Sequence, residues 1–195
     1  MATLGALVEI VAAVAGISRE RVEAMARAVR EAGLIATHGR GPSAAQMAET
    51  DAANLLIAVN AAETARSAPE TVRRFRVLRA NNKAKYEFGS VLDGMIAAAT
   101  KQELSGYLLG LGFGSVGKEP EMQRSGLGTF TIKVEFELSR PMAIVKCRIP
   151  AIDMPKSVPF FPPREKRGVR VEADRRTITT ITERTILAVA EMMRR

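Results

Sequence analysis

The chain has 195 residues, of which 47% are apolar and 26% charged, enough to bury a core in one large domain or two small ones. It contains one cysteine and one histidine, which excludes an internal disulfide and a four-ligand structural zinc site. Aromatic residues make up 5% of the chain, too few for a platform on which single-stranded nucleic acid could stack. The first apolar stretch, residues 4–14, is too short to cross a bilayer, so we expect a cytoplasmic protein without membrane contact.

The net charge of +8 favours a polyanionic partner, but the charge is distributed unevenly. Residues 1–68 carry a net charge of −1, residues 69–128 carry +3 and residues 129–195 carry +6. The net positive charge therefore lies in residues 69–195, which follow the N-terminal segment.

Residues 7–32 have the spacing of two helices joined by a tight turn. Ala12 is small where a second helix would cross, Gly16 suits a turn that needs positive φ, and Val22 closes the pair. Ser18 is a good N-cap for a second helix that runs to Ala32 and stops at Gly33. The outward face of this second helix is expected to carry Arg19, Glu20, Glu23, Ala24 and Arg27.

The residues that follow extend this pattern. The run Arg30 to Ile35 leads into a predicted strand, a glycine-rich basic tip at 38–42 and another helix near Thr50. Residues 7–60 as a whole resemble the winged helix–turn–helix of the IclR and MarR regulator families. The resemblance implies binding of double-stranded DNA. We expect the contacts from Ser18, Arg19, Glu20, Glu23, Arg27, His38 and Arg40.

The middle segment, residues 67–111, is expected to be helical. Pro69 begins a helix that buries Val72, Phe75 and Leu78, and a second helix spans 89–109, where Ser90 and Asp93 resemble a capping box. The segment from 66 to 85 contains seven basic residues. It is either a phosphate-binding patch or a solvated helix face. The predicted patch consists of Arg73, Arg74, Arg76, Arg79, Lys83 and Lys85.

The last segment changes to a period of two. Residues 130–138 alternate apolar and polar side chains, and residues 142–149 form a second expected strand. Five prolines are expected to exclude regular structure from 150–163, while 169–173 should pair with 176–180 before a helix at 183–193. These elements predict an α+β unit with a small antiparallel sheet of three or four strands, in which Cys147 is a core residue.

These patterns divide the chain into four parts. We expect a winged helix–turn–helix at 1–66, a helical connector at 67–111, a glycine-rich linker at 112–128 and an α+β assembly domain at 129–195. The apolar strand face and the last helix offer more apolar surface than a small sheet covers, which predicts a homo-oligomer. Fragments from the C-terminal part are expected to oligomerise, and fragment 1–66 is expected to be monomeric.

No catalytic motif emerges, so we expect no enzyme activity and no cofactor. Residues 112–118 have the spacing of a phosphate-binding loop, but Glu119 stands where magnesium requires a hydroxyl and would repel phosphate. Glu135 and Glu137 are expected on the solvent-exposed face of a strand, a setting that does not suggest acid–base catalysis.

Three functions fit this description. The first is an oligomeric transcriptional regulator that binds operator DNA. The second is a DNA-packaging adaptor, since the whole-chain layout is weakly similar to that of phage small terminase subunits. The third is a protein-interaction or structural component without a DNA role.

Overall fold

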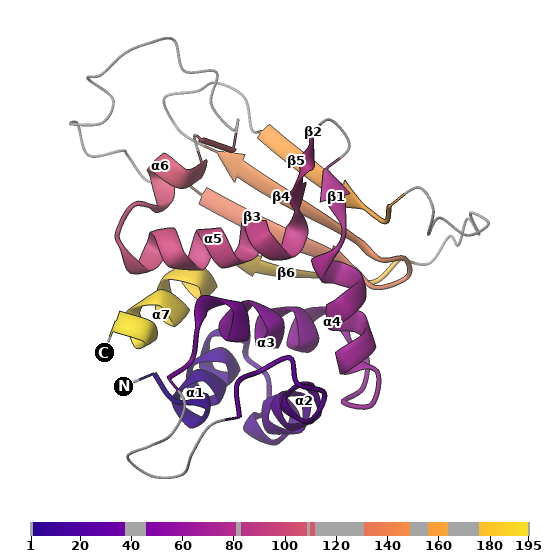
Figure 1. The fold of residues 1–195 in the computed structure, drawn as a ribbon, viewed down its shortest axis with the longest axis vertical. Coiled ribbons are helices and arrows are strands. Elements are labelled where there is room, and N and C mark those ends of the chain that lie inside the picture. The colour runs from indigo at the N-terminus through magenta and orange to yellow at the C-terminus, as the bar shows by residue number, and fades with distance from the viewer. Residues whose placement is uncertain are drawn as a thin grey trace.

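The computed structural model describes residues 2–37, 46–80, 83–108, 110–111, 131–148, 156–163 and 176–194. These residues form an α+β fold, as expected (Figure 1). The helices are α1 (Leu4–Ala15), α2 (Arg19–Glu31), α3 (Glu49–Ala61), α4 (Ala68–Arg76), α5 (Phe88–Thr100), α6 (Leu104–Leu108) and α7 (Glu183–Arg194). The strands are β1 (Arg79–Ala80), β2 (Lys83–Glu87), β3 (Thr131–Glu137), β4 (Met142–Arg148), β5 (Lys156–Phe161) and β6 (Ile178–Thr182).

The six strands form one antiparallel sheet in the order β2-β1-β5-β4-β3-β6. The sheet is larger than the expected three or four strands because residues 79–87, expected in the helical connector, contribute two strands and residues 156–161 contribute a third. Arg79 therefore lies on a strand and not on the helix where we predicted it. The expected partner of β6, residues 169–173, lies outside the described residues; among those described, β6 pairs with β3.

The prediction that prolines exclude regular structure from 150–163 was wrong for β5. Pro159 pairs with Ile144 of β4 inside this strand. On the other side of β5, Arg79 and Ala80 of β1 pair with Phe161 and Phe160. Residues 156–161 therefore form a strand in spite of the proline within it.

The molecule is layered, with the sheet on one side and the helices on the other (Figure 1). Helices α3, α5 and α7 lie between the sheet and the pair α1–α2. Every residue of α3 from Asp51 to Ala61 is buried, because this helix packs against other elements on all sides. One continuous apolar cluster runs from Ala2 to Ala190 through both layers.

Four phenylalanines hold the sheet to the helices. Phe88 of α5 packs edge-on against Phe136 of β3 and Phe160 of β5, with ring centroids 5.7 and 5.5 Å apart. Phe75 of α4 adds contacts with Phe88 and Phe136 at 6.5 and 6.0 Å. A buried aromatic pair stabilises a fold by more than the area that it removes from water. This cluster therefore stabilises the packing of α4 and α5 on the sheet.

The helix expected at 89–109 is broken in two. Gln102 has φ +62° between α5 and α6, which ends α5 after Thr100. The expected capping box at Ser90 is wrong as well, since the N-cap of α5 is Glu87 and the Asp93 carboxylate binds Arg76. Glu137, predicted to face water, is only 4% exposed and forms an ion pair with Arg140 at 2.8 Å.

Candidate nucleic-acid interface on α2 and α4

Helices α1 and α2 meet at the turn that the sequence predicts. Gly16 has φ +63°, and its N–H and that of Ile17 both bind the carbonyl of Ala12. Ser18 caps α2 by accepting the N–H of Arg21 on its Oγ at 3.4 Å. Val22, Met25 and Val29 are buried against the core, as expected, and Gly33 follows the helix with φ +72°. The structure therefore contains the two helices joined by a glycine turn that the sequence predicts.

The segment after α2 does not form the expected strand. Within residues 34–37, the backbone bonds instead to side chains of α3: Asn54 donates to the Leu34 carbonyl at 2.6 Å, and the Ala36 N–H donates to Asp51 at 2.9 Å. The side chains of Asn54 and Asp51 therefore bind the backbone carbonyl and N–H groups that would bind a neighbouring strand in a sheet. The expected basic tip, with His38 and Arg40, lies outside the described residues.

The outward face of α2 has mixed charge. Arg19, Glu20, Glu23 and Arg27 are all exposed on it. Arg19 forms ion pairs with Glu9 of α1 and with Glu23, the latter at 2.9 Å. The hydrogen bond with Glu23, and next the charge of Glu9, raise the pKa of Arg19. Any anion that approaches Arg19 competes with these two carboxylates.

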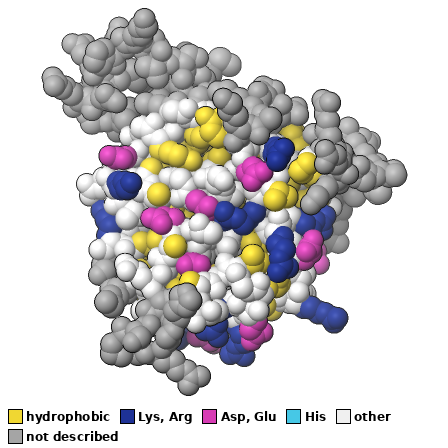
Figure 2. Space-filling view, viewed as in Figure 1, with side chains coloured by type: hydrophobic (Ala, Val, Ile, Leu, Met, Phe, Trp, Pro, Cys, Tyr) yellow, Lys and Arg dark blue, Asp and Glu magenta, His cyan; other side chains and the backbone are white. Residues whose placement is uncertain are grey.

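Helix α4 adds arginines beside α2. Arg73 of α4 donates to the carbonyl of Ala32 at the end of α2, at 3.4 Å. Arg21 of α2 donates to the carbonyl of Glu63, shortly before α4, at 3.3 Å. Figure 2 shows Lys and Arg side chains along the flank where Figure 1 places α4. These two bonds therefore place arginines from both helices on one surface.

Several exposed arginines of α2, of α4 and of the segment before α4 have no carboxylate partner among the described residues. Within the described part of the chain, ion pairs involve Arg19, Arg76 and Arg79 but none of Arg21, Arg27, Arg30, Arg66, Arg73 and Arg74. All six are exposed. We call this set the α2–α4 arginine surface. The sequence prediction placed Arg66 in the basic segment 66–85 but did not single out Arg21, which its bond to Glu63 joins to the segment before α4.

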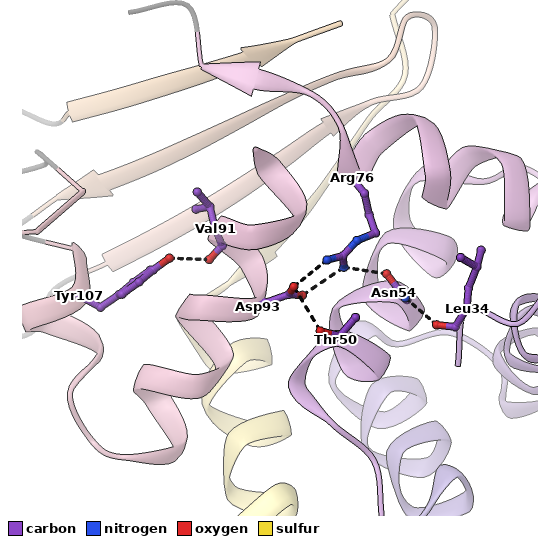
Figure 3. Close-up of polar contacts among 7 residues, drawn as sticks. All are labelled: Leu34, Thr50, Asn54, Arg76, Val91, Asp93 and Tyr107. Atoms are coloured by element: carbon purple, nitrogen blue, oxygen red, sulfur yellow. Dashed lines mark hydrogen bonds and ion pairs between the residues drawn. The ribbon is translucent and has the colours of Figure 1, made fainter. Parts of the chain in front are cut away.

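Two members of the predicted phosphate patch have other partners. Arg79 pairs with Glu87 of β2 at 3.1 Å. Arg76 lies inward, where its guanidinium donates to both oxygens of Asp93, at 3.1 and 2.7 Å, and to Asn54 Oδ1 at 2.9 Å (Figure 3). Lys83 and Lys85 lie on β2, and their side chains are outside the described residues.

The Arg76 network joins the N-terminal helices to the rest of the molecule. Asn54 links Arg76 to Leu34 after α2, and Thr50 donates to Asp93 at 3.3 Å (Figure 3). Both charged side chains are largely shielded, with 23% and 22% exposed for Arg76 and Asp93. One polar network therefore joins α3, α4, α5 and the segment after α2.

No metal-binding arrangement accompanies this surface in the described ranges. A search of those residues finds no group of three His, Cys, Asp or Glu side chains able to hold a metal ion. It also finds no helix long and apolar enough to cross a membrane. Cys147 lies buried on the sheet face that packs against the helices, and burial raises the pKa of its thiol to about 11.

Comparisons of the chain with protein-family models, with curated proteins and with solved structures gave no match.

Proposed function

We propose that the chain binds double-stranded DNA and acts as a transcriptional regulator. The observation that carries the proposal is the position of α2. It follows a glycine turn, exposes one long face and lies beside Arg73 and Arg74 of α4, which form no ion pair within the described residues. In this arrangement α2 enters the major groove while Arg73 and Arg74 bind phosphates of the backbone.

The residues of the surface divide into two roles. Arg27 is central on the exposed face of α2 and is assigned to base edges, where an arginine reads guanine by two hydrogen bonds. Arg66, Arg73 and Arg74 are assigned to phosphates, which supply affinity without sequence information. Glu20 and Glu23 flank Arg27 and disfavour phosphates there, which restricts α2 to base contacts.

The test is fluorescence anisotropy with duplexes selected from a random pool by the wild-type chain. Arg27→Ala is expected to weaken binding of the selected duplex by about 1–3 kcal/mol, and to relax sequence preference. Arg148→Ala is the matched control, because Arg148 is an exposed arginine at the end of β4 on the sheet. Equal affinity of the Arg27→Ala variant and the wild type would refute the role of α2.

Two other functions are separated by simple measurements. A DNA-packaging adaptor would assemble as a ring of many copies, which particle mass reveals. A chain that acts through protein contacts alone would select no duplex from the pool.

A further inference from the structure

Arg76 is the last residue of α4 and, unlike the exposed Arg73 and Arg74, is largely shielded from solvent. Its side chain lies against α5, where an ideal Cβ added to Gly89 would lie 3.0 Å from the Cβ, Nε and Cζ atoms of Arg76. Asp93 follows four residues later on the same face of α5 and accepts from the guanidinium through both of its oxygens (Figure 3). A glycine and a carboxylate one helical turn apart therefore receive this one arginine.

Asn54 of α3 connects Arg76 to the end of α2. Asn54 is 3% exposed, its amide oxygen accepts from Arg76 at 2.9 Å, and its amide nitrogen donates to the Leu34 carbonyl at 2.6 Å. A buried amide favours the arrangement in which both of its ends have partners, because either end left unpaired costs free energy. The three residues that receive Arg76 are called the Arg76 seat: Gly89, Asp93 and Asn54.

We propose that the Arg76 seat positions the α2–α4 arginine surface for DNA. The seat holds Arg76, and Arg76 sets the position of α4 at which Arg73 and Arg74 bind phosphates while α2 lies in the major groove. Arg73 and Arg74 precede Arg76 by less than one helical turn, so a shift of Arg76 displaces both of them. This inference rests on the proposed function, and the seat acts through the arginines of α4 and not by contact with DNA.

The first experiment separates positioning from stability through the salt dependence of duplex binding. Asp93→Asn removes the charge that receives Arg76 and is expected to lower the slope of log Kd against log salt by about 2, as the loss of two phosphate contacts does. R73A/R74A removes the same contacts directly, so adding Asp93→Asn to it is expected to lower the slope no further. Glu135→Gln is the matched control, because Glu135 is a similarly shielded carboxylate that pairs with a lysine of β4 on the sheet, and it leaves the slope unchanged.

The second experiment uses no DNA and measures the position of α4 beside α2. Spin labels at Ala24→Cys on α2 and Glu70→Cys on α4, both exposed positions, give the distance between the two helices by double electron–electron resonance. Cys147→Ala removes the native thiol from all the labelled chains. Asp93→Asn and Gly89→Ala are each expected to broaden the distance distribution, the second because its added Cβ displaces Arg76.

The matched control Glu135→Gln is expected to keep the wild-type distance distribution, and a melting curve confirms that each variant folds. A wild-type distribution in both seat variants would overturn the proposal, whether or not the wild type binds DNA. An unchanged salt slope in Asp93→Asn, or a further drop when it is combined with R73A/R74A, would overturn it as well, because the seat would then not act through these two arginines. If the wild type bound no duplex while both seat variants broadened the distribution, the proposed function would be contradicted and the hold of the seat on α4 confirmed.

Discussion

Arginine side chains have three different roles at the residue scale. Arg19 and Arg79 form exposed ion pairs with neighbouring glutamates, which contribute little to stability. Arg76 is shielded and binds both Asp93 and Asn54. Arg27 and Arg74 are exposed, and the ion pairs of the described chain do not include them. Burial and partners, and not residue type, therefore decide which arginines can bind phosphate or DNA bases.

Gly94 shows how a missing side chain positions another residue. A Cβ at Gly94 would collide with the ring of Tyr107, whose Oη donates to the Val91 carbonyl at 3.3 Å. We expect Gly94→Ala to lower the free energy of unfolding by about 1–3 kcal/mol, because Tyr107 must leave its site.

Gly106→Ala is the matched control for Gly94→Ala. It lies in α6, where an added Cβ meets no atom within 4 Å, and the alanine should stabilise that helix slightly. Urea denaturation of both variants measures the difference, and an equal effect of the two substitutions would contradict the role of Gly94.

The buried thiol of Cys147 predicts a dependence of stability on pH. Burial raises its pKa from 9.0 to about 11, so the folded chain keeps the proton at pH values where the unfolded chain loses it. The contribution of Cys147 to the free energy of unfolding is therefore complete below pH 9 and is lost as pH rises toward 11.

Urea denaturation between pH 8 and pH 11 checks this expectation, with Cys147→Ala as reference so that other titrating groups cancel. The wild type should lose more stability than Cys147→Ala over this range. Parallel pH profiles of the two chains would show that the thiol ionises normally in the fold.

At the element scale, local periodicity predicted most helices and two strands. The cores of α1, α2, α4 and α7 and the strands β3 and β4 lie close to their expected positions, because each has a regular apolar repeat. Strand β5 contains a proline within its pairing to β4, and β1 pairs on one side with β5, far along the chain. Such pairing depends on tertiary contacts that periodicity does not encode.

The turn between α1 and α2 offers a direct test of that local prediction. Gly16 has φ +63° with no atom within 4 Å of an added Cβ, so a substitution there acts on the backbone alone. We expect Gly16→Ala to cost about 1–2 kcal/mol of unfolding free energy.

Gly5→Ala, within α1, is the control, since its added Cβ would meet only Thr3 Oγ1 at 4.0 Å. Thermal unfolding compares the two variants. If Gly16→Ala melts at or above the temperature of Gly5→Ala, the left-handed turn is not important for stability.

At the scale of the whole molecule, the candidate site arises from contacts that the sequence did not predict. The outward residues of α2 followed from helical spacing, and the arginines of α4 from their density along the chain. Helices α2 and α4 lie side by side because Arg73 of α4 donates to the Ala32 carbonyl at the end of α2. The Arg76 network in addition joins α4 to α3. The same continuous core also joins these helices to the sheet.

The salt dependence of duplex binding tests the central proposal most directly. Fluorescence anisotropy gives the Kd of wild type and of R73A/R74A at several salt concentrations. If α4 binds two phosphates, the slope of log Kd against log salt should be lower in the double variant by about 2, because each phosphate contact contributes about 0.9. Equal slopes for the two chains, or no binding of duplex by the wild type, would contradict the assignment of the α2–α4 arginine surface to DNA.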